Sequence, residues 1–199
     1  FLTSAPVSKI IVKNKKAAGV ELENGTIIEA DLVISNADLW FTETKLLEKK
    51  QQTYPERYWE KAVLSPSAFI MYLGLDRKVA VLSHHNLRFG GDWKQNFKEL
   101  FDTPQLPEDP SYYICKPTET DPDLAPEGTD SLYVLVPIPP GLTLSEEEMK
   151  RYRQKILTLV KTDLKLPEIE DYIVYERSYW SDDFRRDYNA YKGTALGLA

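Results

Sequence analysis

The feature that most constrains the fold is a long amphipathic pattern over residues 145–164. Ser145 and Glu148 match a capping box, in which the serine caps a helix and the glutamate side chain returns to the serine backbone. Apolar side chains then recur with the 3.6-residue period of an α-helix, at Met149, Tyr152, Ile156, Leu159, Val160 and Leu164. A helix of this kind buries one face against an apolar surface.

Strands are expected on both sides of that helix. The apolar run over residues 68–75 predicts a central strand, and further strands are expected over residues 86–89, 112–116, 131–138 and 171–179. A second helix is expected over residues 92–101, with Trp93, Phe97, Leu100 and Phe101 on one face. Because strands and helices alternate without a regular βαβ unit, we expect an α+β fold with a mixed or antiparallel sheet flanked by helices.

The first 34 residues predict a β-meander. Its strands are expected over residues 7–12, 19–22, 26–28 and 32–34. Asn24 and Gly25 separate the second strand from the third. This dipeptide predicts a type I′ hairpin turn, in which both central residues take a positive φ.

Two more helices are expected after the meander. Ser35 and Asp38 form a capping box, with Ser35 as N-cap and Asp38 at the third helical position, which predicts a helix from residue 36 that Leu39 to about Lys50 continues. Thr53 and Glu56 form another, which predicts a helix over residues 56–64, with a proline tolerated in its first turn.

Composition narrows the class of protein. The chain has 199 residues, with 25 Lys and Arg against 31 Asp and Glu, and its net charge of −6 argues against nucleic acid as the partner. Cys115 is the single cysteine, so no internal disulfide forms, which fits a reducing, cytoplasmic compartment. No apolar run approaches the roughly 20 residues that span a bilayer. Both ends look cut, which predicts a fragment of a longer chain.

Most motifs for chemistry are absent. No Gly-x-Gly-x-x-Gly is present, so this chain cannot supply the usual loop for a dinucleotide pyrophosphate. His84 and His85 are adjacent, and on a strand they would point to opposite faces, so we expect no metal site. Cys115 is expected to be a small core residue, and no catalytic residue is identified. The 12 tyrosines either line a long apolar pocket or pack between strands.

Three segments together resemble one family. Residues 6–38 (PVSKIIVKNKKAAGVELENGTIIEADLVISNAD) resemble the segment of flavin-dependent amine-oxidase-like proteins that re-enters the FAD domain. Residues 109–139 (DPSYYICKPTETDPDLAPEGTDSLYVLVPIP) closely resemble a signature of bacterial phytoene desaturases and related carotenoid desaturases. Residues 183–199 (DFRRDYNAYKGTALGLA) resemble the segment before the last FAD-binding region, with Leu196 in place of the usual phenylalanine.

The resemblance implies an FAD-dependent oxidoreductase that dehydrogenates a long polyene such as phytoene by hydride transfer to flavin. Residues 1–38 would then belong to the FAD domain, residues 39–180 to the substrate domain, and residues 181–199 to a segment returning to the FAD domain. The glycine-rich FAD motif lies outside this chain, so residues 1–199 alone are not expected to bind FAD tightly. Related chemistries remain open, namely a carotenoid isomerase, a carotenoid oxidase or a retinoid saturase. A non-catalytic module that binds apolar ligands or membranes is a further alternative.

The same resemblance implies which residues approach the cofactor. Asn36, Ala37 and Asp38 resemble the strand-end turn that faces the flavin, where small residues allow close backbone approach. Pro6 and Val7 resemble the position whose backbone meets the adenine.

A long hydrocarbon substrate has to be collected from a membrane, so we expect a peripheral membrane protein that docks through an exposed apolar patch. The helix after Ser35 carries Leu39, Trp40, Phe41, Leu46 and Leu47 and is the expected patch. The alternative is that this turn is buried on several sides.

Overall fold

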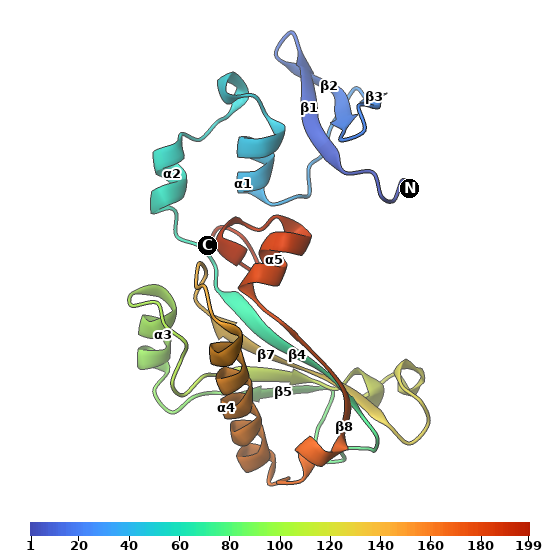
Figure 1. Cartoon of the computed structure of the whole chain (residues 1–199), viewed down its shortest axis with the longest axis vertical. Coiled ribbons are helices and arrows are strands. Elements are labelled where there is room, and N and C mark those ends of the chain that lie inside the picture. The colour runs from blue at the N-terminus through green and yellow to red at the C-terminus, as the bar shows by residue number, and fades with distance from the viewer.

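The computed structural model describes residues 1–199 and contains two antiparallel sheets joined by helices (Figure 1). The first sheet has the order β1-β2-β3, and the second has the order β5-β6-β7-β4-β8. Their strands are β1 (Val7–Lys13), β2 (Lys16–Leu22), β3 (Ile27–Glu29), β4 (Ser67–Leu75), β5 (His85–Arg88), β6 (Tyr112–Cys115), β7 (Asp130–Ile138) and β8 (Ile173–Tyr179). Every strand pair is antiparallel, which confirms the α+β class.

The helices are α1 (Leu39–Phe41), α2 (Glu56–Lys61), α3 (Trp93–Phe101), α4 (Glu146–Leu164) and α5 (Ser181–Tyr188). A π-helical turn (Thr42–Leu46) continues α1. Short 3₁₀ turns occur at Lys49–Gln51, Pro117–Glu119, Pro122–Leu124, Ile169–Tyr172 and Tyr191–Gly193. None of these helices is both long and apolar enough to cross a bilayer. In Figure 1, α5 lies between the five-stranded sheet and the part of the molecule that holds α1, α2 and the meander.

Helix α4 covers one face of the five-stranded sheet and builds the main core. The predicted capping box is confirmed, because Ser145 Oγ accepts from Glu148 N at 3.3 Å and Glu148 Oε2 accepts from Ser145 N at 2.8 Å. Ile156 of α4 is fully buried against alternate side chains of the sheet, such as Phe69 of β4 and Val136 of β7. Since neighbouring side chains on a strand point to opposite faces, the residues between them form a second face that α4 does not cover.

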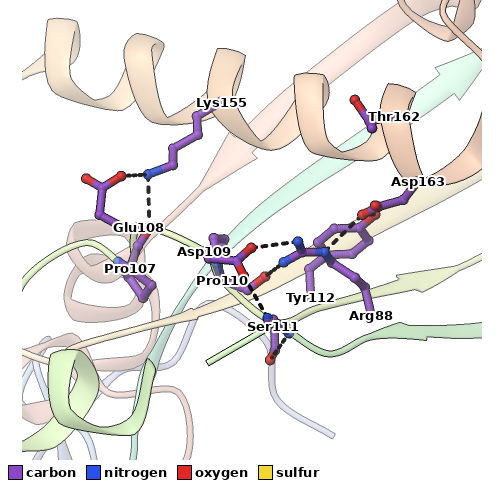
Figure 2. Close-up of polar contacts among 12 residues, drawn as sticks. Arg88, Pro107, Glu108, Asp109, Pro110, Ser111, Tyr112, Lys155, Thr162 and Asp163 are labelled. Carbon is purple, nitrogen blue, oxygen red and sulfur yellow. Dashed lines mark hydrogen bonds and ion pairs between the residues drawn. The ribbon is translucent and has the colours of Figure 1, made fainter. Parts of the chain in front are cut away.

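An ion-pair network fastens the edge of this sheet to α4 (Figure 2). Arg88 of β5 pairs with Asp109 at 2.6 Å and with Asp163 of α4 at 3.0 Å, and it also donates to the Pro110 carbonyl at 2.6 Å. Tyr112 Oη donates to the same Asp163 carboxylate at 2.7 Å. The Gly91 N–H and then Arg88 hold the pKa of the Asp109 carboxyl below its usual range, so this network is charged at neutral pH.

The meander has three strands rather than four. The tight two-residue turn lies at Asn14 and Lys15, which take φ values of 51° and 63°, as a type I′ turn requires. At the predicted position only Gly25 has a positive φ, 82°, and its N–H donates to the Leu22 carbonyl at 2.9 Å. This is a three-residue loop with glycine in the left-handed position, so the type I′ prediction at Asn24 and Gly25 was wrong.

Residues 32–34 form no strand. Leu32 and Ile34 are 73% and 83% exposed, and β3 has already ended at Glu29. An apolar triplet has the composition of a buried strand, but a strand also requires a hydrogen-bonding partner, and none lies beside these residues in the described chain.

The predicted cap at Ser35 is also corrected. Asp38 caps α1, with Oδ1 accepting from Phe41 N at 3.0 Å, while Ser35 Oγ bonds instead to Thr42 Oγ1 at 2.7 Å. The expected long helix therefore begins later and ends at Leu46. Helix α2 begins at Glu56 as predicted, but Pro55 and not Thr53 is its N-cap, and the helix ends at Lys61 and not at Leu64.

The aromatic residues of α3 face outward: Trp93, Phe97 and Phe101 are exposed at 60%, 56% and 40%. Leu100 is instead buried together with Asn96 and Glu99, so the prediction that Leu100 shares the face of the aromatic residues was wrong. The Glu99 carboxylate accepts hydrogen bonds from the side chains of Gln95 and Gln105 and from the Glu108 backbone. These bonds compensate the buried carboxylate and hold the aromatic face outward.

Candidate cofactor and substrate site

A cavity of about 690 Å³ lies where the chain returns from the five-stranded sheet towards the first residues of α1. One wall is Asn36, Ala37, Asp38 and Leu39, so the structure brings the three residues of the predicted flavin-side turn together in one cavity. The other wall comes from α5 and the segment after it: Phe184, Asp187, Tyr188, Asn189, Ala190, Thr194, Ala195, Leu196, Gly197 and Leu198.

Asp38 ties the two walls together. One carboxylate oxygen caps α1, and the other accepts from the Tyr191 backbone N–H at 3.3 Å. Trp40, two residues further, stacks on the Tyr191 ring with centroids 4.8 Å apart. Because both oxygens of Asp38 accept from backbone N–H groups, this residue positions the turn against the return segment.

The end of the return segment, residues 195–199, pairs with residues 63–66 in the manner of an antiparallel strand. Ala195 N donates to the Pro66 carbonyl at 3.1 Å, Ser65 N to the Gly197 carbonyl at 2.9 Å, and Ala199 N to the Val63 carbonyl at 3.0 Å. Leu64 and Leu198 form an isolated antiparallel bridge. The chain therefore enters and leaves the five-stranded sheet side by side, at the rim of the cavity.

Pro6 and Val7 lie elsewhere. Pro6 is exposed just before β1, and its carbonyl accepts from Glu23 N at 2.9 Å. Val7 pairs with Leu22 in the meander. Neither Pro6 nor Val7 lines the cavity. The structure therefore does not bring these two predicted residues together with Asn36, Ala37 and Asp38.

The cavity suits one side of a flat ring system. Ala37, Ala195 and Gly197 leave backbone close to the open space, and the Asp38 carboxylate is already satisfied. The 199 residues contain no Gly-x-Gly-x-x-Gly loop of the kind that binds a dinucleotide pyrophosphate.

The sheet face opposite α4 carries a row of tyrosines. Tyr72 of β4 pairs directly with Tyr133 of β7, and their ring centroids are 6.2 Å apart. Tyr113 of β6 lies 5.5 Å from Tyr133, and His85 of β5 lies 5.9 Å from Tyr113. Tyr72 is 41% exposed. We call this surface, formed by Tyr72, Tyr113 and Tyr133, the tyrosine face.

Helix α5 joins the tyrosine face to the cavity. Phe184 packs edge-on against Tyr179 of β8 at 5.0 Å, in a small cluster that also contains Ala68 and Ile70 of β4. Tyr188, 6.1 Å from Phe184, lines the cavity. Aromatic rings therefore continue from the cavity, over the end of the sheet, towards its far edge.

The phenols of Tyr72, Tyr113 and Tyr179 have raised pKa values and are uncharged at neutral pH. Burial raises the pKa of Tyr72, and burial followed by the hydrogen bond to Asp187 raises the pKa of Tyr179. A hydrogen bond with the Cys115 side chain is the main reason that the pKa of Tyr113 is raised. The rings thus offer neutral, flat, largely apolar surface.

The segment that resembles the desaturase signature is mainly scaffold. Besides the network of Figure 2, Asp130 accepts from Val79 N and from Thr118 Oγ1, both at 2.7 Å, and pairs with Lys78 at 3.3 Å. Burial opposes ionisation of Asp130, yet its pKa lies below the ordinary value because these three partners favour the carboxylate. Lys116 is buried and donates to the Val79 carbonyl at 3.1 Å. These polar groups hold loops and line no part of the cavity.

The two histidines do not point apart. His84 immediately precedes β5, so the alternation of a strand does not govern its side chain, and the His84 and His85 rings lie 4.2 Å apart. Together with Cys115 they bring three potential metal-ligand atoms within 4.8 Å of one another. The expectation that the two histidine side chains point to opposite faces was wrong. Cys115 is buried, as predicted.

Sequence reasoning missed the lining of α5 and the tyrosine face. A local signal existed for α5, because Asp182 and Asp183 lie in its first turn and Arg185 and Arg186 in its last, as helix termini favour. For the tyrosine face, the signal is the two-residue alternation of each strand, read on the face that the amphipathic helix leaves uncovered.

Comparisons with known proteins agree on one family. The family of flavin containing amine oxidoreductases matches residues 1–197. A carotenoid 3,4-desaturase of Haloarcula japonica is 41% identical over 199 residues, covering all of this chain and 40% of that protein. A zeta-carotene-forming phytoene desaturase of Myxococcus xanthus is 40% identical, with 100% and 38% covered, and a 4,4'-diaponeurosporene oxygenase of Staphylococcus haemolyticus is 33% identical, with 90% and 36% covered.

The chain thus spans about two fifths of the length of these relatives. Among solved structures, an oxidoreductase from Methanosarcina mazei shares 20% identity with a TM-score of 0.47, covering 87% of this chain and 36% of that one, a likeness that carries no weight here. The match of the family model to residues 1–197, nearly the whole chain, shows that this chain belongs to the flavin containing amine oxidoreductases.

Proposed function

We propose that this chain is the substrate-binding part of an FAD-dependent carotenoid desaturase, which dehydrogenates a long polyene such as phytoene. The observation that carries the proposal is the continuity of a cavity walled by Asn36, Ala37 and Asp38 with a row of neutral aromatic rings. An uncharged hydrocarbon requires such a surface, since it has no polar group to be recognised. The relatives named as carotenoid and phytoene desaturases support the same substrate class.

In this proposal residues 1–38 belong to the FAD domain, residues 39–180 bind substrate, and residues 181–199 lead back. Asn36, Ala37, Asp38 and the return segment approach the flavin, and Pro6 and Val7 approach its adenine end. FAD supplies the hydride acceptor. The chain's own residues position the polyene: Tyr72, Tyr113 and Tyr133 contact it with ring faces and exclude water. Their π-electrons also favour positive charge, such as would develop on a polyene that loses hydride.

The test is a kinetic comparison in the full-length enzyme, with phytoene in liposomes. Tyr72→Leu and Tyr133→Leu are each expected to lower kcat/KM by at least about tenfold, equal to about 1.4 kcal/mol of transition-state stabilisation. Tyr58→Leu is the matched control, because Tyr58 is a 37% exposed tyrosine on α2, away from the tyrosine face. Equal activity of all three variants would refute the assignment of the tyrosine face, whereas oxygenated or isomerised products would move the chemistry to a related reaction.

We also propose that the enzyme is a peripheral membrane protein and that α3 makes the contact. The surface expected from sequence does not fit, because Trp40 is half-buried against Tyr191 and Leu46 is buried. Helix α3 instead exposes Trp93, Phe97 and Phe101.

Helix α3 and the residues just before it have features that suit a lipid interface. Tryptophan and phenylalanine side chains occupy the interface of bilayers, and the exposed Lys94 and Lys98 lie among the aromatic residues, where they complement anionic headgroups. Leu87 and Phe89, just before the helix, add exposed fractions of 68% and 76%. Leu87 pairs with Tyr113, so the apolar edge is continuous with the tyrosine face, as uptake of a membrane-dissolved substrate requires.

Flotation of the full-length enzyme with liposomes tests this surface. Trp93→Ser combined with Phe97→Ser is expected to abolish co-flotation while flavin content and melting temperature stay unchanged. Trp40→Ser combined with Phe41→Ser is the matched double variant at the surface first expected from sequence, and it should still float. Retention by the α3 variant, or loss confined to the α1 variant, would contradict the assignment.

A further inference from the structure

We propose that His84, His85 and Cys115 form a binding site for a zinc ion at the edge of the five-stranded sheet. The site is separate from the cavity and lies at the far end of the tyrosine face.

The strand register places the three ligands together. His85 is directly opposite Cys115 in the pairing of β5 with β6, and His84 lies next to both at the start of β5. One ligand atom from each residue lies within 4.8 Å of the other two. Ligands of a tetrahedral zinc ion at about 2.0 Å for nitrogen and about 2.3 Å for sulfur lie between 3 and 4 Å apart by simple geometry. A movement of about 1 Å by side chains therefore completes the site.

The side chains that have to move are those of His84 and His85, which are less buried than Cys115. Cys115 is buried at the end of β6, where it pairs with both β5 and β7, whereas His84 is half-buried and His85 is exposed. The imidazole rings can rotate towards the fixed sulfur without disturbing the core.

Both rings already have the hydrogen-bonded support typical of metal-bound histidines. His84 Nδ1 lies 2.7 Å from Thr120 Oγ1, and His85 Nδ1 lies 2.5 Å from Tyr113 Oη. These hydroxyls leave Nε2 of each ring available to a metal. Hydrogen bonds to the non-ligating nitrogen orient a histidine and contribute to metal affinity.

The donor set selects the class of ion. Two imidazoles and a thiolate suit zinc and similar transition metals, and the absence of a carboxylate from the cluster disfavours magnesium or calcium. The nearby Lys116 ammonium is held elsewhere, at 2.5 Å from Glu119 and 3.1 Å from the Val79 carbonyl. A bound ion would clamp the edge strand β5 to β6.

The test uses the full-length protein, stripped with a chelator and then titrated with zinc in a calorimeter. X-ray absorption at the zinc edge is expected to show one sulfur at about 2.3 Å and two nitrogens at about 2.0 Å. Zinc should also raise the melting temperature, because it binds only the folded arrangement. Cys115→Ser should remove the sulfur and weaken binding at least tenfold. Thr120→Val, which keeps all three ligands, should weaken binding by about 10-fold to 100-fold.

Ser83→Ala is the matched control, an exposed neighbour whose side chain makes no hydrogen bond, and it should bind zinc like the wild type. If Cys115→Ser unfolds, the surface variant His84→Asn, His85→Asn gives the same answer with the core intact. Failure of the wild type to bind zinc, or a zinc shell that lacks sulfur and is unchanged in these variants, overturns the proposal.

Discussion

Replacing Gly193 by alanine tests whether the return segment, residues 181–199, packs as closely against the Ser181 backbone as the structure shows. Gly193 has a φ of 67°, and a Cβ there would lie 2.3 Å from the Ser181 carbonyl oxygen and 2.8 Å from its carbon. The left-handed conformation costs an alanine about 1–2 kcal/mol. Overpacking against a backbone that cannot move freely adds about 1–3 kcal/mol. The expected destabilisation is therefore about 2–5 kcal/mol.

Gly197 gives the matched control within the same segment. Its φ is 82°, but a Cβ there would meet nothing within 4 Å, so Gly197→Ala should cost only the conformational part, about 1–2 kcal/mol. Thermal unfolding of the full-length enzyme measures the difference in stability. Flavin content per chain measures the functional consequence, because a displaced segment distorts the cavity wall. Equal melting temperatures for the two variants would refute the packing argument, and unchanged flavin content in Gly193→Ala would refute the place given to the cavity.

Three further outcomes are expected. Asp130→Ala should destabilise the protein by about 1–3 kcal/mol in urea unfolding, because it leaves the buried Val79 N–H without an acceptor, and a variant that matches the wild type would contradict this. Hydrogen bonds from Lys9 and then from Lys50 lower the pKa of Glu48 to about 2, so the stabilisation they give should be present above the ordinary pKa near 4.5 and be lost as pH falls through about 2. NMR titration of Lys9→Ala should show the pKa of Glu48 rise without reaching its ordinary value, because Lys50 still pairs with the carboxylate at 2.9 Å. Residues 1–199 alone should not bind FAD with sub-micromolar affinity, and a fluorescence titration showing such binding would refute the expectation.

The elements predicted best from sequence are those whose signals are local. Helix α4 was located by its cap and its period, since Ser145 and Glu148 bond each other and five of its apolar residues are buried. The central strands β4 and β7 were located by apolar composition alone.

The predictions that were wrong concern features that depend on contacts between residues far apart in the sequence. The periodicity of α3 gave its aromatic face correctly but not its direction, because that depends on Glu99 meeting Gln105 and Glu108 from the following loop. Residues 32–34 have the composition of a strand but lack a partner strand. The cap of α1 moved from Ser35 to Asp38 because Asp38 also binds the backbone of Tyr191, a contact that spans 153 residues.

The site was partly predictable for the same reason. Asn36, Ala37 and Asp38 were identified by resemblance, and the structure places them in a cavity. The opposite wall depends on the return of the chain past residues 63–66, which local pattern does not encode. The histidine pair was misjudged because strand alternation was applied to His84, which lies just outside β5.

The most direct test of the proposed function is anaerobic mixing of the full-length enzyme with phytoene in liposomes, followed by absorption spectroscopy and product analysis. The proposal predicts that the oxidised flavin absorbance falls as a product with a longer conjugated polyene forms, and that Tyr72→Leu slows both changes together. A flavin that stays oxidised in the presence of phytoene and other acyclic carotenoids, in an enzyme that is folded and fully loaded with FAD, would contradict it.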